Sequence, residues 1–226
     1  MFAVAIDGLA GCGKSSLALG LAHRLGFRYF NTGAMYRGIT CEYLRLFGPT
    51  EPNEEKIDKL LQNLDVKIVF EGDDQHVVVN GIDQTPSLRK ETVSNMTPFV
   101  SGYKNLRDKV RDIQRSFARE HNCIMEGRDI GSVVLTNADV KIYLTATSKE
   151  RAKRRFEQMA NDPARPSLDE ILEDIKKRDE VDKSREHGKL YAPKDAIVVD
   201  NSNYTLEQTI ATCEKIIKEK LAQSKA

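Results

Sequence analysis

The sequence has little of what metal and redox sites are usually built from. It contains only four cysteines, at positions 12, 41, 123 and 213, and no two of them form a CxxC pair. The four histidines, at positions 23, 76, 121 and 187, pair with no cysteine or carboxylate at metal-ligand spacing. These absences exclude the common kinds of zinc and dithiol site, and they predict reduced thiols in a reducing compartment.

Long apolar runs and a strong charge imbalance are also missing. No stretch approaches the ~18 apolar residues that a membrane-spanning helix needs. The formal net charge is only +1, so no overall field draws the chain to nucleic acid or to an anionic membrane. The first residues form a strand-like run without the basic segment of a signal peptide. We therefore expect a cytoplasmic chain that binds neither nucleic acid nor a membrane.

What the sequence does contain is an alternation of short apolar runs and amphipathic helical stretches. The helical spacing is clearest in Ser15–Leu25, which stops at Gly26, and in Thr205–Leu221. Such alternation predicts an α/β fold with a mostly parallel sheet covered on both faces, within a single domain of residues 1–226. The strand-like runs are Phe2–Ile6, Phe27–Phe30, Cys123–Met125, Val140–Leu144 and Ala196–Val199.

One segment breaks this alternation. Val66–Phe70 and His76–Val79 are short alternating runs joined by Glu71-Gly72-Asp73-Asp74, a composition typical of a β-hairpin. Because a crossover helix does not fit there, we expect an inserted subdomain at about residues 62–98.

A complete GxxxxGKS motif follows the first strand. Its glycines let successive backbone N–H groups curl around phosphates. Lys14 is expected to reach the β- and γ-phosphates of a nucleotide, and the Ser15 hydroxyl to ligate Mg²⁺. An incidental glycine-rich turn is disfavoured, because a strand precedes the motif and a helix follows it. The expected ATP-binding set is Gly8, Leu9, Ala10, Gly11, Cys12, Gly13, Lys14, Ser15 and Ser16. The position of Cys12, at a helix start beside Lys14, further predicts a reactive thiol.

Further features distinguish between classes of phosphate-handling enzyme. GTPases need a base-reading NKxD string, and the nearest match, Thr136-Asn137-Ala138-Asp139, lacks the lysine. Arginines, which bind phosphate oxygens as a fork, recur in clusters. An acceptor that is itself a phosphate monoester is already ionised at pH 7, since its second pKa is ~6. Such a reaction needs convergent arginines rather than a general base.

Arg128 is the best-placed of these arginines. It lies in Gly127-Arg128-Asp129-Ile130-Gly131, directly after a strand, and ligands of open α/β sheets bind beyond the carboxyl ends of strands. Arg178, Asp182 and Arg185 share one helix face, and a surface salt-bridge stripe is the alternative interpretation there. Arg151, Arg154 and Arg155 share another helix face and precede a turn-rich break. We expect a mobile lid at about residues 151–166.

Over essentially its whole length the chain resembles the bacterial-type cytidylate kinases, P-loop nucleoside monophosphate kinases. The resemblance implies a five-stranded parallel core sheet, a monophosphate-binding insert and a short lid. It implies ATP and Mg²⁺ as cofactors and CMP or dCMP as acceptors, in a monomer. The matching segments are Ile6-Asp7-Gly8 with the loop that follows, Asn31-Thr32-Gly33-Ala34-Met35-Tyr36-Arg37, the hairpin, Gly127–Gly131, Glu150–Arg155 and Arg178–Arg185.

The same resemblance assigns roles to individual residues, with Lys14, Arg128, Arg154 and Arg185 as the catalytic set. The ligands of the acceptor phosphate would be Arg37, Arg128 and Arg185. The cytosine readers would be Thr32, Arg107 and Asp129. Arg178 and Asp182 would face the pentose. The lid arginines near the ATP phosphates would be Arg151, Arg154 and Arg155.

The chain departs from the family pattern at four positions. Asn31 and Glu126 stand where Asp is usual, Pro98 where some members have a pentose-contacting serine, and Cys12 where a small residue is usual. The first two predict tuning rather than loss, and Pro98 leaves the ribose preference open. Two alternatives stay open as well: another small kinase of the UMP/CMP, adenylate or shikimate type, and a catalytically silent nucleotide-binding module.

Overall fold

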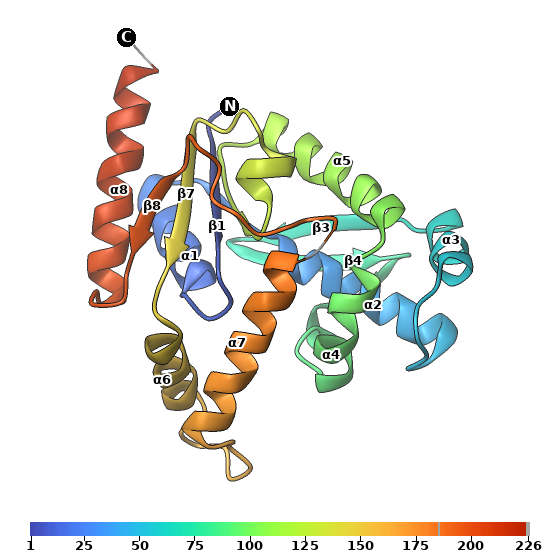
Figure 1. The fold of residues 1–226 in the computed structure, drawn as a ribbon. Coiled ribbons are helices and arrows are strands. Elements are labelled where there is room, and N and C mark those ends of the chain that lie inside the picture. Colours follow the sequence, from blue (N-terminus) through green and yellow to red (C-terminus); the bar gives the residue numbers. More distant parts are fainter. Residues whose placement is uncertain (185, 225–226) are drawn as a thin grey trace. The chain divides into compact units, whose positions relative to one another are not determined.

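The computed structural model describes residues 1–184 and 186–224 and divides the chain into two compact units. The first unit comprises Met1–Arg28 and Glu120–Ala226, and the second comprises Tyr29–Arg119. Figure 1 shows the elements of both. Within the described residues, every helix is too short or too polar to span a lipid bilayer.

A five-stranded parallel sheet, in the order β2-β6-β1-β7-β8, forms the core of the fold. The central strand β1 is apolar throughout its middle, and Val4 and Ile6 are fully buried, as expected for a parallel strand covered on both faces. The register places Asp7 of β1 opposite Gly127 of β6. The segments that follow these two strands therefore start side by side. The strands are β1 (Ala3–Gly8), β2 (Arg28–Asn31), β6 (Cys123–Gly127), β7 (Val140–Thr145) and β8 (Ile197–Asp200).

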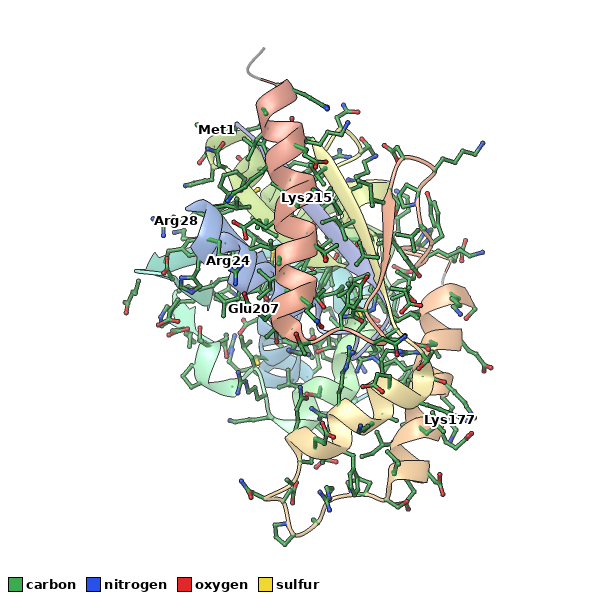
Figure 2. All side chains as sticks on the ribbon, turned by 90° about the vertical axis from the view of Figure 1, so that its left-hand side faces the viewer. Met1, Arg24, Arg28, Lys177, Glu207 and Lys215 are labelled. Carbon is green, nitrogen blue, oxygen red and sulfur yellow. The ribbon has the colours of Figure 1, made fainter. Side chains whose placement is uncertain are left out.

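Two helices of the first unit pack together beside this sheet. The helix α1 (Lys14–Leu25) buries Leu17 and Leu21 and ends at Gly26, whose positive φ of 66° makes it the C-cap. The helix α8 (Leu206–Gln223) begins with a capping box on Thr205. Figure 2 shows Arg24 of α1 beside α8, where it pairs with Glu207.

The helices α6 (Ser148–Gln158) and α7 (Leu168–Ser184) form an antiparallel hairpin in the first unit (Figure 1). A small core of Ala152, Ile171 and Ile175, extended by Phe156, holds the two helices together. The turn between them contains Arg165, whose guanidinium lies 3.7 Å from the centre of the Phe156 ring. This hairpin includes the segment expected to act as a lid.

The second unit surrounds a small antiparallel sheet of β3 (Val66–Glu71), β4 (Asp74–Val79) and β5 (Ile82–Asp83). The turn between β3 and β4 contains Gly72 at a φ of 62°. Val77 and Val79 of β4 are fully buried, and α2 packs against this strand. The helical elements of the unit are α2 (Thr32–Phe47), α3 (Glu54–Gln62), the single turn η1 (Thr85–Ser87), α4 (Glu91–Val100) and α5 (Lys104–Glu120).

The α/β class and the five-stranded parallel sheet predicted from the sequence are confirmed. The hairpin lies where the alternating pattern indicated. The compact unit around it runs from Tyr29 to Arg119, which is wider than the expected insert of about residues 62–98. The reason is packing, because α2 contacts β3, β4, α3 and α4. Helices that precede the small sheet in the sequence and helices that follow it therefore belong to the same unit.

Candidate active site

The loop between β1 and α1 adopts a conformation that only its glycines permit. Gly8 has a φ of 152°, and a Cβ atom there would lie 2.0 Å from the carbonyl oxygen of Leu144 on the neighbouring strand. Gly13, the N-cap of α1, has a φ of 92°. Both are left-handed conformations that side chains rarely adopt. The loop therefore approaches β7 closely and turns directly into the N-terminus of α1, which is a natural anion site.

Lys14, the motif lysine, is folded back onto this loop. Its Nζ donates hydrogen bonds to the carbonyl oxygens of Gly8 at 2.9 Å and of Leu9 at 2.8 Å, and the residue is only 5% exposed. Burial lowers the pKa of the Lys14 ammonium, and the positive charge of Arg128 lowers it further. Two cations, Lys14 at the start of α1 and Arg128 after β6, thus repel each other in a largely buried region, an arrangement that a bound anion would stabilise.

Ser15 and Glu126 are joined by a hydrogen bond next to the loop. The Ser15 hydroxyl donates to Glu126 Oε1 at 2.9 Å, joining the start of α1 to the end of β6. The residues that the structure describes contain no cluster of three or more His, Cys, Asp or Glu side chains able to hold a metal ion. A hydroxyl with one carboxylate suits Mg²⁺, which uses few protein ligands and takes the rest from water and substrate phosphates. These two residues therefore fit the expected Mg²⁺.

Cys12 differs from expectation. Its thiol is fully buried and donates to the carbonyl oxygen of Leu9 at 3.0 Å. The expectation of a reactive thiol was wrong in its premise, because reactivity needs access as well as a cationic neighbour. The sequence placed Cys12 beside Lys14 correctly but gave no sign that the loop would turn the side chain inward.

Arg128 is held at the end of β6 by a carboxylate from α7. Its Nε donates to Asp182 Oδ2 at 2.7 Å, with the Arg128 side chain 21% exposed. Burial lowers the pKa of the Arg128 guanidinium, but the charge of Asp182 and its hydrogen bond outweigh burial and the pKa is raised. Arg128 is thus a fixed, permanent cation. Asp182, expected to face a pentose, here orients Arg128.

Asp129 starts η2 (Ile130–Val134), a single π-helical turn of the kind that often marks functional sites. Its carbonyl oxygen accepts hydrogen bonds from the amides of Val133 and Val134. Asp7 binds the first residues of the same turn. Its carboxylate accepts hydrogen bonds from the amides of Ile130 and Gly131, both at 2.7 Å. The turn that carries Asp129 is therefore fastened to the strand that carries the phosphate-binding loop.

Asp7 is a residue that sequence reasoning missed. Burial raises its pKa to about 6, against the lowering effect of the two backbone hydrogen bonds. A signal was available, since an acidic residue at the end of an otherwise apolar strand is rarely buried without a partner.

In the second unit, the expected acceptor-binding residues Thr32 and Arg37 lie on α2. Thr32 is buried at the first position of that helix, and Asn31 caps it by accepting from the Ala34 amide at 2.9 Å. A cap explains why Asn can replace the usual Asp there. Arg107 of α5 places its guanidinium 5.3 Å from the ring centre of Tyr36, one turn after Thr32. The unit therefore brings Thr32 and Arg107, two expected readers, to the same region.

The remaining expected residues of the first unit have diverse surroundings. Arg154 donates to the side chain and the backbone carbonyl of Asn201. Asn201, which sequence reasoning also missed, donates in turn to the Cys12 carbonyl at 3.0 Å. Arg155 and Arg178 are exposed, and Arg151 is buried with protein acceptors around it. Arg185 lies outside the described residues.

Comparisons with known proteins find relatives that match this chain over almost its whole length. A sequence model of the cytidylate kinase family matches residues 4–219. The cytidylate kinase of Chlorobaculum tepidum is 41% identical over 212 residues, which cover 92% of this chain and 88% of that protein. The cytidylate kinase of Halalkalibacterium halodurans is 37% identical over 219 residues, 96% and 98% of the two chains. Among solved structures, an uncharacterized protein from Eubacterium ventriosum matches with a TM-score of 0.52 and 11% identity over 98% of each chain, a similarity of fold alone.

Proposed function

The chain belongs to the cytidylate kinase family, and we propose that it transfers the γ-phosphoryl group of ATP to CMP and to dCMP. The products are ADP and CDP or dCDP. The enzyme is thus a phosphotransferase whose acceptor is a phosphate group. The observation that carries the proposal is the glycine-shaped loop that leads into the N-terminus of α1, with Lys14 held against the loop carbonyl oxygens and the charge of Arg128 acting on Lys14. Two phosphate groups, one on each nucleotide, are what these two cations would bind.

The residues of the chain divide the work between donor and acceptor. Lys14 stabilises the charge that develops on the transferred phosphoryl group, and Arg128 binds the acceptor phosphate through the edge of its guanidinium that Asp182 leaves open. Because the acceptor phosphate is ionised at pH 7, no side chain has to remove a proton from it. Ser15 and Glu126 would hold Mg²⁺, which when bound would neutralise charge on the phosphates.

Three polar side chains are the proposed readers of the acceptor base. Asp129 offers a carboxylate to the amino group of cytosine, while Arg107 and Thr32 offer donors to its acceptor atoms. Arg37 and Arg185 complete the acceptor-phosphate set, Arg178 faces the pentose, and Arg154 and Arg155 serve the ATP phosphates from the lid of about residues 151–166. We propose that the enzyme is a cytoplasmic monomer whose partners are ATP, CMP and dCMP, and not nucleic acid or a membrane.

A coupled assay of ADP release from Mg·ATP, run with CMP, dCMP, UMP, AMP, GMP and shikimate, tests the proposal. Release that depends on CMP or dCMP and is far weaker with the others supports it. Equal use of UMP or AMP would place the chain among broader monophosphate kinases. ATP binding without ADP release from any acceptor would identify the silent nucleotide-binding module.

A further inference from the structure

Arg151, at the start of α6, is a charged side chain held entirely by protein acceptors. It is 2% exposed. Its Nε donates to the carbonyl oxygen of Ala146 at 3.0 Å, and its Nη1 donates to the carbonyl oxygen of Ala10 at 2.9 Å. Both oxygens of Asp179, on α7, accept from the same guanidinium at 3.0 and 2.6 Å. The side chain thus links α6 and α7 to the phosphate-binding loop.

The contact with Ala10 matters because of how such a loop binds phosphate. For successive N–H groups to converge on an anion, the carbonyl groups of the loop point outward and need donors of their own. Lys14 supplies donors to Gly8 and Leu9, and Asn201 supplies one to Cys12. For Ala10 the donor is Arg151. Each side chain therefore fixes a different peptide of the loop.

Asp179 determines where the Arg151 guanidinium points. A bidentate carboxylate restrains the planar fork in a single orientation, which a lone contact would not do. Gly11, which follows Ala10, has a φ of 74°. A Cβ atom added at Gly11 would lie 3.7 Å from the Cβ of Arg151. The backbone at this point has conformational freedom that an outside contact must restrict.

We propose that Arg151, oriented by Asp179, is a positioning residue that holds the Ala10 peptide in the conformation that binds the ATP phosphates. This role replaces the direct phosphate contact expected from the sequence, since four N–H groups of the guanidinium already donate to protein atoms. It rests on the proposed ATP-dependent reaction. The consequence is specific: weakening the link impairs ATP binding while CMP binding, which relies on other residues, is retained.

Two variants separate positioning from simple stability. Arg151→Lys keeps a positive charge beside Asp179 but offers one ammonium that cannot reach Ala10, Ala146 and both carboxylate oxygens together. The double variant Arg151→Met/Asp179→Leu removes both buried charges and keeps apolar bulk, a replacement that buried ion pairs often tolerate in stability. The control is Glu173→Gln, which breaks an exposed ion pair with Lys176 on the same helix, where Glu173 is 59% exposed.

The measurements are Tm, KM for ATP and for CMP, and the Kd for Mg·ATP by calorimetry without acceptor. We expect KM and Kd for ATP to rise about tenfold or more in both variants, because each loses at least one charge-assisted hydrogen bond. The KM for CMP should change less than about twofold. The control should match the wild type. Three outcomes would overturn the proposal. They are an unchanged ATP affinity in Arg151→Lys, a wild-type ATP affinity in a double variant of normal Tm, and equal rises in the KM values for ATP and CMP. A wild type that binds Mg·ATP but leaves CMP unphosphorylated would refute the proposed function alone, because the calorimetric comparison does not depend on the acceptor.

Discussion

The hydroxyl of Ser15 donates a 2.9 Å hydrogen bond to the carboxylate of Glu126. Ser15 lies in the first turn of the helix that follows the glycine-rich loop, and Glu126 lies near the end of strand β6. A serine or threonine with an acidic side chain is the arrangement by which P-loop enzymes hold their magnesium ion. Glu126 was expected only as a tolerated departure from Asp, and the structure gives it a partner that defines its place in the site.

The first prediction concerns this pair. Glu126→Gln keeps the shape and the hydrogen bond but removes the charge, so the Mg²⁺ concentration for half-maximal activity should rise about tenfold, as for the loss of a charge-assisted contact. The Mg²⁺ concentration for half-maximal activity of Glu126→Asp should lie between those of Glu126→Gln and the wild type. Titrating Mg²⁺ at saturating ATP measures this. An unaltered Mg²⁺ dependence in Glu126→Gln would remove Glu126 from the metal site.

Lys14 should be needed for turnover and not for folding. Its ammonium is buried among loop carbonyls, and in the proposed reaction its charge stabilises the transferred phosphoryl group. Lys14→Ala should lower kcat about 100-fold or more, as for a lost electrostatic stabiliser. Circular dichroism and Tm check that the fold is intact. Turnover near that of the wild type would remove the loop lysine from the mechanism.

Asp7 should make stability fall as the pH rises. Its pKa is raised to about 6 from an ordinary value of 3.8. The folded state therefore holds this proton more tightly than the unfolded state, and the associated stability is present below the ordinary pKa and lost as the pH rises through about 6. Relative to Asp7→Asn, the wild type should lose about 1.4 kcal/mol between pH 5 and 7.5. Urea unfolding at several pH values measures the difference, and a constant difference would show that Asp7 titrates normally.

Much of the fold was predictable because its signals are local. The glycine motif, the strand before it and the helix after it are contiguous in the sequence, and so are the hairpin and its turn. Asp7, Asn201 and the inward-facing Cys12 thiol were not predictable in the same way. Each depends on contacts between residues more than a hundred positions apart or on a backbone turn that no spacing rule describes. Arg151 shows both sides: its helix was predicted, but its burial against Asp179 was not.

Arg128 should serve the acceptor far more than the donor. Arg128→Ala removes the cation that we assign to the acceptor phosphate. The loss of a charge-assisted contact worth about 1.5–3 kcal/mol should lower kcat/KM for CMP ten- to a hundredfold. The Kd for Mg·ATP should change much less. Arg128→Lys keeps a charge beside Asp182 and so controls for the loss of the ion pair with that carboxylate. Equal loss of ATP affinity in both variants would assign Arg128 to the other phosphate.

Base selectivity follows from the hydrogen-bonding edge of cytosine. Cytosine presents an amino donor beside two acceptors, N3 and O2, whereas uracil presents a carbonyl in place of the amino group and a proton on N3. Asp129 is buried, and in the proposed assignment its carboxylate accepts from the amino group while Arg107 and Thr32 donate to the two acceptors. With UMP, the carboxylate of Asp129 would meet a carbonyl oxygen. A site built for one edge rejects the other strongly, because its buried polar groups are left unpaired.

We therefore expect CMP and dCMP to be preferred over UMP by at least ~100-fold in kcat/KM, with AMP and GMP poorer still. Asp129→Ala should narrow the CMP/UMP ratio mainly by weakening CMP, since the backbone of Asp129 and not its side chain anchors the π-turn at Val133 and Val134. Asp129→Asn should narrow it further, because its amide can donate to the uracil carbonyl. Steady-state kinetics with both acceptors measure the ratio. If the wild type uses UMP and CMP equally, or Asp129→Ala keeps the full ratio, then another residue reads the base or the site reads none.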